Sequence, residues 1–100
     1  MTLTIIAENR LHKPITDAIR DSSGAIERIC AGVDPKNPLY GVDPISDTMF
    51  NEYQINVILD YLSIIEVSSR PGSGDVQALR DAASIAARKG GYLWFRAERR

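Results

Sequence analysis

The sequence predicts a single α+β domain over residues 1–100, in which a helical hairpin packs on a small antiparallel sheet formed by the N- and C-terminal strands. Three observations predict it: a β-branched apolar segment at the start, two helical patterns separated by a Pro/Gly break, and an aromatic segment near the end. One hundred residues, 44% of them hydrophobic, can enclose one hydrophobic core and not two.

The first third of the chain contains a strand, an ambiguous segment and a short helix. Residues 2–7 (TLTIIA) are apolar and β-branched, which favours a strand. Residues 14–20 fit a short helix begun by Pro14 or a second strand, and the pattern does not decide between them. Residues 21–24 (DSSG) are typical of a helix start because Asp and Ser accept hydrogen bonds from free N–H groups. Helical spacing of apolar residues follows, at Ala25, Ile26, Ile29 and Cys30.

Residues 32–44 contain three prolines and predict an ordered loop rather than a helix or strand, because proline fixes φ and removes a hydrogen-bond donor. Loops of this length in compact domains are often functional.

A long amphipathic helix is predicted to follow, ending near Val67. Asp47, Thr48 or Asn51 can cap its start, and Asn51 with Gln54 resembles a capping box. The apolar stripe expected to face the core consists of Phe50, Val57, Ile58, Tyr61, Leu62 and Ile65.

After the break at residues 68–74 (SSRPGSG), a second helix is predicted, with Asp75 in its first turn, Arg88 in its last and Gly90 just beyond. Its small apolar residues predict close antiparallel packing on the preceding helix: Val76, Leu79, Ala82, Ala83 and Ala86. From Tyr92 a final strand pairs with the first, and we expect its aromatic residues Tyr92, Trp94 and Phe95 to lie in the core.

Composition limits the function classes. A formal charge of −1 removes the electrostatic argument for nucleic-acid binding by the whole surface. Cys30 and His12 are single residues of their type, so neither an intramolecular disulfide nor a His/Cys zinc site is expected. The sequence has neither a signal-peptide pattern nor an apolar run that would span a membrane, so we expect a cytoplasmic protein without cofactor.

Few residues suggest catalysis. His12 lies in a polar turn without an obvious partner. Glu52 and Asp60 lie two turns apart on the polar side of the long helix, with Asn56 between them, and such a stripe could bind a hard cation or serve acid/base chemistry. A solvated helix face explains it equally well, and we expect neither an enzyme nor a metal site.

Charge is segregated along the chain. Between Asp34 and Glu66 six acidic residues accompany one lysine, a local charge of −5, whereas residues 80–100 carry six basic and two acidic residues, a charge of +4. A protein-binding surface can use such segregation for steering, although chance clustering in a short chain gives the same pattern.

The segment covering residues 34–62, followed by a second helix and GYLWF, resembles a group of small bacterial proteins, many from actinobacteria, with a DPYGDTVFN..Q core and a terminal YL.F strand. The matching residues are Asp43-Pro44, residues 47–51, Gln54 and Tyr92-Leu93. Ile45-Ser46 replaces their Tyr-Gly pair, and Arg96-Ala97 replaces their Gly-Asp ending. The resemblance carries over no catalytic residue.

Small acidic bacterial domains of this kind are similar to immunity proteins, which neutralise toxins. By analogy with that class, we expect a protein that occludes a cognate toxin with a basic surface. The residues expected to bind it are Asp34, Tyr40, Asp43, Asp47, Glu52, Tyr53, Asn56 and Asp60. The alternative is a small homodimeric regulatory or scaffold module that pairs through an open edge of its YLWF strand, and a third hypothesis is a metal-dependent hydrolase using the stripe from Glu52 to Asp60.

Overall fold

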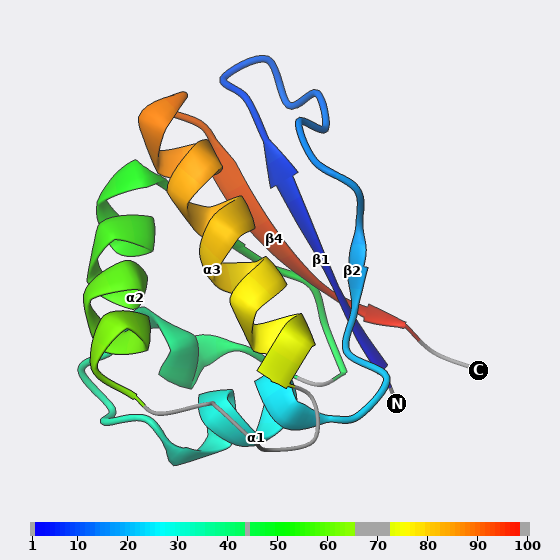
Figure 1. Ribbon diagram of the computed structural model, residues 1–100, viewed down its shortest axis with the longest axis vertical. Helices are drawn as coiled ribbons and strands as arrows, with labels where there is room; N and C mark the ends of the chain where they lie inside the picture. The colour runs from blue at the N-terminus through cyan, green and yellow to red at the C-terminus, as the bar shows by residue number, and fades with distance from the viewer. Residues whose placement is uncertain (1, 44, 66–72, 99–100) are drawn as a thin grey trace.

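The computed structural model describes residues 2–43, 45–65 and 73–98 and confirms the α+β class (Figure 1). In chain order the elements are β1 (Thr2–Glu8), β2 (Ile19–Arg20), α1 (Ala25–Gly32), the 3-10 helix η1 (Pro38–Gly41), β3 (Thr48–Phe50), α2 (Glu52–Ile64), α3 (Ser73–Arg88) and β4 (Tyr92–Glu98). Residues 66–72, on which the predicted end of the long helix and most of the Pro/Gly break fall, lie outside the described residues.

The sheet is antiparallel, with the strand order β2-β1-β4-β3. The N- and C-terminal strands pair along their whole length, from Thr2 opposite Glu98 to Glu8 opposite Tyr92, as predicted. β4 also pairs with β3 on its other side. It is therefore an inner strand, and the expectation that the YLWF segment leaves an open edge is wrong. The edge strands are the short β2 and β3.

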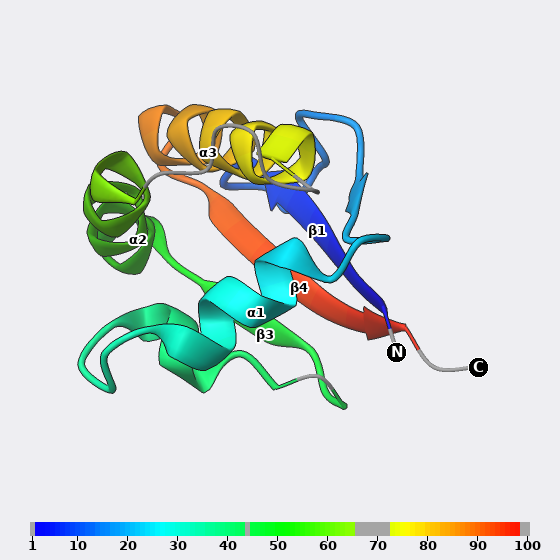
Figure 2. The same cartoon turned by 60° about the horizontal axis from the view of Figure 1, so that its bottom comes forward.

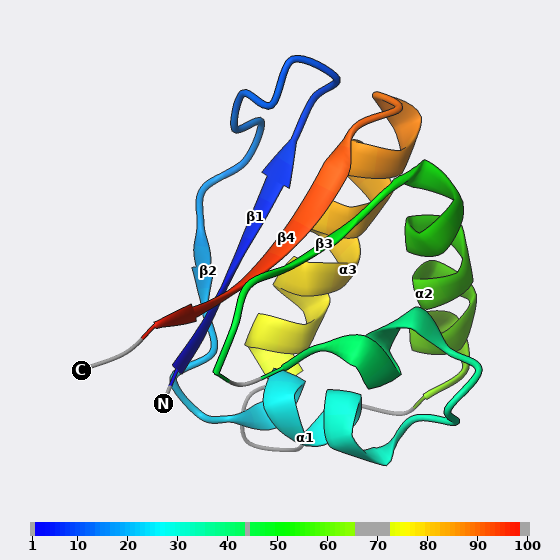
Figure 3. The same ribbon diagram turned by 180° about the vertical axis from the view of Figure 1, so that it is seen from behind.

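The helices cover one face of this sheet. α2 and α3 form the predicted antiparallel hairpin over β1 and β4, and α1 lies at the end of the molecule where α3 begins (Figures 1 and 2). The opposite face of β1, β4 and β3 carries no described helix (Figure 3). One-sided coverage explains the alternation along the inner strands, where Leu3, Ile5 and Ala7 are buried and the residues between them are not.

Small residues let α3 pack closely against both the sheet and α2. The whole predicted stripe is buried, namely Val76, Leu79, Ala82, Ala83 and Ala86. One polar contact joins the hairpin as well: Nη2 of Arg80 on α3 donates a hydrogen bond to the carbonyl oxygen of Leu62 in the last turn of α2. A cation at this position satisfies a helix-terminal carbonyl and interacts favourably with the helix dipole.

The start of α1 depends on a buried carboxylate. Asp21 is only 3% exposed, and its two oxygens accept hydrogen bonds from the backbone N–H groups of Ile26 (3.0 Å) and Glu27 (2.9 Å). The DSSG segment therefore acts as predicted, with Gly24 at the N-cap in the left-handed region (φ 76°).

Three sequence expectations are corrected. Residues 48–50, which we assigned to the beginning of the long helix, form β3, so Phe50 enters the core from a strand beside Phe95. Val57 is exposed, because the inward side of α2 is defined by Ile55, Ile58 and Leu62.

Strand alternation causes the third correction. Phe95 is buried in the core, whereas Tyr92 and Trp94 point to the opposite, helix-free face of β4, where they are half-buried. Within residues 14–20 the strand alternative holds only for Ile19–Arg20, with Ile19 opposite Ile5, and Pro14 forms one isolated bridge to Glu8.

We predict that Asp21→Ala lowers the free energy of unfolding by about 2 kcal/mol, because two buried N–H groups at the start of α1 lose a charged acceptor. Urea unfolding followed by circular dichroism measures the change. Ser22→Ala, at an exposed neighbouring residue, is the matched control and should leave stability unchanged. An equal effect of both substitutions would contradict this role of Asp21.

Candidate functional site: the outer face of helix α2

A capping box fixes where α2 begins. The Asn51 side chain accepts a hydrogen bond from the backbone N–H of Gln54, and the Gln54 side chain accepts one from the N–H of Asn51, both at 3.0 Å. Of the three capping residues that the sequence offered, Asn51 is the N-cap. This start sets which residues of α2 point away from the core.

Large apolar side chains occupy that outward direction. Tyr53, Val57 and Ile64 are 80%, 46% and 77% exposed, and together with Asn56 and Asp60 they fall within about a third of the helix circumference. We call these five residues the outer α2 face. Exposed apolar side chains grouped in this way mark interaction surfaces more often than isolated ones do.

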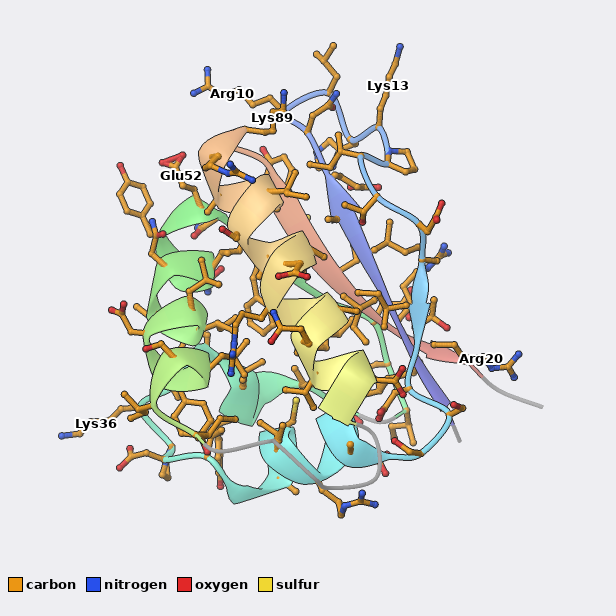
Figure 4. All side chains as sticks on the ribbon, in the orientation of Figure 1. Arg10, Lys13, Arg20, Lys36, Glu52 and Lys89 are labelled. Carbon is orange, nitrogen blue, oxygen red and sulfur yellow. The ribbon has the colours of Figure 1, made fainter. Side chains whose placement is uncertain are left out.

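The outer α2 face is electronegative. Glu52 and Asp60 are the charged residues of α2, and the helix has no lysine or arginine. Three residues that we predicted to bind a partner therefore lie on one face (Tyr53, Asn56 and Asp60), with half-buried Glu52 in the first turn of the same helix (Figure 4). Val57 was expected to face the core and Ile64 was not among the predicted residues, although both follow Tyr53 at helical spacing on the exposed side.

The remaining predicted residues lie elsewhere. Tyr40 is exposed on η1, which contacts α2. Asp34 and Asp43 stabilise loop turns, because their Oδ1 atoms accept hydrogen bonds from the N–H groups of Lys36 (2.8 Å) and Ile45 (2.9 Å). The carboxylates thus order turns of the predicted loop, but the expectation that this segment contains no helix is wrong, because Pro38–Gly41 form η1, with Pro38 at its start and the Asn37 side chain as its cap.

Asp47 belongs to the helix-free face of the sheet. Its Oδ1 accepts a hydrogen bond from the N–H of Ala97 (3.0 Å), and its Oδ2 lies 3.8 Å from Nε of Arg96. With Ile6, Glu8 and Trp94, these two charged residues line a shallow pocket of about 230 Å³.

Two of the lining residues, Glu8 and Trp94, belong to a polar network. Oε1 of Glu8 accepts a hydrogen bond from Nε1 of Trp94 (2.6 Å) and lies 3.0 Å from Nδ1 of His12. The His12 ring stacks on Tyr92, with centroids 4.2 Å apart. His12 therefore has partners that sequence analysis missed, and the i, i+4 spacing from Glu8 together with strand alternation in β4 were the available signals.

Other chemistry has limited support in the described part of the chain. Residues 2–43, 45–65 and 73–98 bring together no three His, Cys, Asp or Glu side chains that could hold a metal ion. No helix among them is long and apolar enough to cross a membrane.

Cys30 is buried in the core on α1. Burial raises the pKa of its thiol from 9.0 to about 12, and the nearby charges of Asp21 and Glu27 add to the rise. A thiol with so high a pKa is a poor nucleophile at neutral pH.

No model of a known protein family matches the chain, and neither curated proteins nor solved structures give a match.

We predict that Cys30 makes stability fall at alkaline pH. The unfolded chain loses the thiol proton above about pH 9 while the native state keeps it to about pH 12, so the contribution is complete below pH 9 and declines as pH rises towards 12. At about pH 10 the loss is on the order of 1 kcal/mol. Urea unfolding at about pH 8 and about pH 10 measures it, with Cys30→Ala as the reference without a thiol. The same pH dependence in both proteins would refute it.

Proposed function

We propose that the protein is a non-catalytic binding protein of the immunity type, which neutralises a cognate toxin by covering a basic surface of it with the outer α2 face. The observation that supports this proposal most directly is the grouping of Tyr53, Val57 and Ile64, all exposed, on one side of a capped helix.

The apolar part of this face supplies affinity in the proposal. Tyr53 is exposed along most of its side chain, and an aromatic residue with few rotatable bonds is the type that dominates binding energy in protein interfaces. Val57 and Ile64 extend the contact by almost three helical turns along the same side. Because α2 is anchored by Ile55, Ile58 and Leu62 in the core, the face needs little ordering on binding.

The charge of α2 supplies orientation. Glu52 and Asp60 create a negative potential around the apolar side chains, and no basic residue of the helix opposes it. Complementary charge accelerates encounter and excludes partners of the same sign. A partner with lysine or arginine residues around an apolar depression fits both properties.

A tagged pull-down from a lysate of the source organism at low salt, with mass spectrometry and chromatographic stoichiometry, tests whether such a partner exists. One basic protein bound about one to one supports the proposal. If no stoichiometric partner is recovered, the immunity function is contradicted for those conditions.

Once the partner protein is identified, we predict that Tyr53→Ala weakens binding to it by roughly thirtyfold, because the largest exposed side chain of the outer α2 face is removed. Isothermal titration calorimetry measures the dissociation constant. Met49→Ala, at an exposed apolar residue on the helix-free face of the sheet, is the control and should bind normally. Equal loss in both variants would place the interface elsewhere.

Charge can be tested separately on the same helix. We predict that Asp60→Lys slows association and weakens its dependence on salt, since steering by the acidic residues of α2 is reduced. Stopped-flow association at several salt concentrations measures both quantities, and Asp17→Lys, an equal charge change at an exposed residue away from α2, is the control. An unchanged association rate for Asp60→Lys would remove charge steering from the proposal.

A further inference from the structure

The turn between β1 and the segment leading to β2 is held in one shape by Asn9. Its side-chain oxygen accepts hydrogen bonds from the N–H groups of Leu11 (2.9 Å) and Lys13 (3.1 Å), and its backbone bonds to His12 and Lys13. We call residues 10–13 (Arg-Leu-His-Lys) the basic tip.

The basic tip includes a strained residue. His12 has φ 61°, in the left-handed region that residues other than glycine rarely adopt. Its ring is fixed by the Glu8 carboxylate and by stacking on Tyr92, which offsets the unfavourable backbone conformation. The turn is therefore preorganised, and less order has to be imposed when it binds.

This rigid turn presents an apolar side chain among cations. Leu11 is 75% exposed, and Arg10, Lys13 and Lys89 extend outward around the same end of the molecule (Figure 4). Within the described part of the chain, none of these three side chains forms an ion pair with a carboxylate. The basic tip thus offers a protruding leucine with uncompensated positive charge around it.

An open groove of about 450 Å³ lies between residues 16–20, which follow the basic tip in the chain, and α3. Its apolar lining includes Ile19 and Ile85, both half-buried, together with Ala18 and Ala82. Small alanine side chains leave room between the larger isoleucines, so the groove is suited to receive an aliphatic side chain.

Carboxylates surround this apolar lining. Asp17, Asp75 and Asp81 line the groove, and Arg20 is the one basic residue among its lining residues. Asp17 and Asp81 are exposed, and Asp75 is half-buried in the first turn of α3. The groove therefore carries the opposite charge to the basic tip. It is also concave, whereas the tip protrudes.

We propose that a second copy of this chain occupies the groove, with Leu11 of each copy inserted into the groove of the other and Lys13 placed against its carboxylates. Charge complementarity between two surfaces of one chain carries this assignment. The chain runs from the basic tip into residues 16–20, which line one side of the groove, and complementary surfaces on one side of a molecule allow a closed twofold dimer rather than an open chain. The outer α2 face takes no part in this contact.

Sedimentation over a concentration series up to roughly millimolar protein, at low and high salt, tests the proposal. We expect a monomer–dimer equilibrium that weakens as salt rises. A monomer throughout the series would overturn the inference, and so would open-ended oligomers, which indicate a head-to-tail contact.

Matched single substitutions locate the contact. Lys13→Glu should weaken dimerisation by about tenfold or more, because a like charge then faces the carboxylates of the groove. Lys36→Glu makes the same charge change at the opposite end of the molecule and should have no effect (Figure 4). Asp17→Lys should weaken the dimer as Lys13→Glu does, whereas Asp60→Lys on α2 should not. Equal effects of Lys13→Glu and Lys36→Glu would contradict the assignment.

A charge exchange gives the sharpest result. Neither Lys13→Glu nor Asp17→Lys should dimerise well alone, whereas a mixture of the two variants should form a heterodimer. This heterodimer has two contacts. In one, the substituted residue 13 of one variant faces the substituted residue 17 of the other, with the charges exchanged. In the other, the unchanged Lys13 faces the unchanged Asp17. A mixture that associates no better than either variant alone would overturn the proposal even if the wild type dimerises.

A separate substitution tests the apolar part of the contact. Leu11→Ser should weaken every pairing, because the side chain that enters the groove is replaced by a small polar one. Since Leu11 is exposed, the thermal unfolding of this variant should match that of the wild type. Dimerisation of Leu11→Ser at the wild-type level would contradict the insertion of Leu11.

Discussion

The pairing of β1 with β4 is the constraint on which the rest of the structure depends. Seven residues from each end of the described chain lie opposite one another in the middle of the sheet, so all intervening residues must leave this pair and return to it. The helical hairpin covers one face of the pair, and β2 and β3 protect parts of its two edges. Phe95, Leu93 and Ile5 anchor the core because they belong to these inner strands.

Sequence patterns were sufficient where one local signal dominated. The spacing of small residues fixes α3 without knowledge of distant residues, and the Asn51–Gln54 pattern correctly marked one of three candidate starts of α2. The pattern failed at Thr48–Phe50, because three residues become a strand only through pairing with β4, nearly fifty positions later. A short edge strand carries little propensity of its own, and tertiary contacts decide its conformation.

The candidate binding residues also divide into those that a local pattern predicts and those that depend on distant contacts. An exposed helix face can be derived from periodicity once the buried residues are known, so Tyr53, Asn56 and Asp60 were accessible to sequence reasoning. Asp34, Asp43 and Asp47 were selected by charge, but each carboxylate accepts a backbone hydrogen bond in the structure. Charge alone does not distinguish an acidic residue that binds a partner from one that stabilises a turn. The Glu8–Trp94–His12 network needs the register of β1 and β4, which residue patterns do not contain.

The position of β4 also determines the order in which the fold can form during synthesis. Of the described strands β1 is synthesised first, but its main partner follows about ninety residues later, so the sheet has a high contact order. Before β4 is synthesised, the hairpin of α2 and α3 and the capped α1 can form locally. During that time β1 stays without its main partner strand. Among the described elements β4 comes last in the chain, and it completes the centre of the sheet rather than its edge, so the structure of this domain should be gained late and cooperatively.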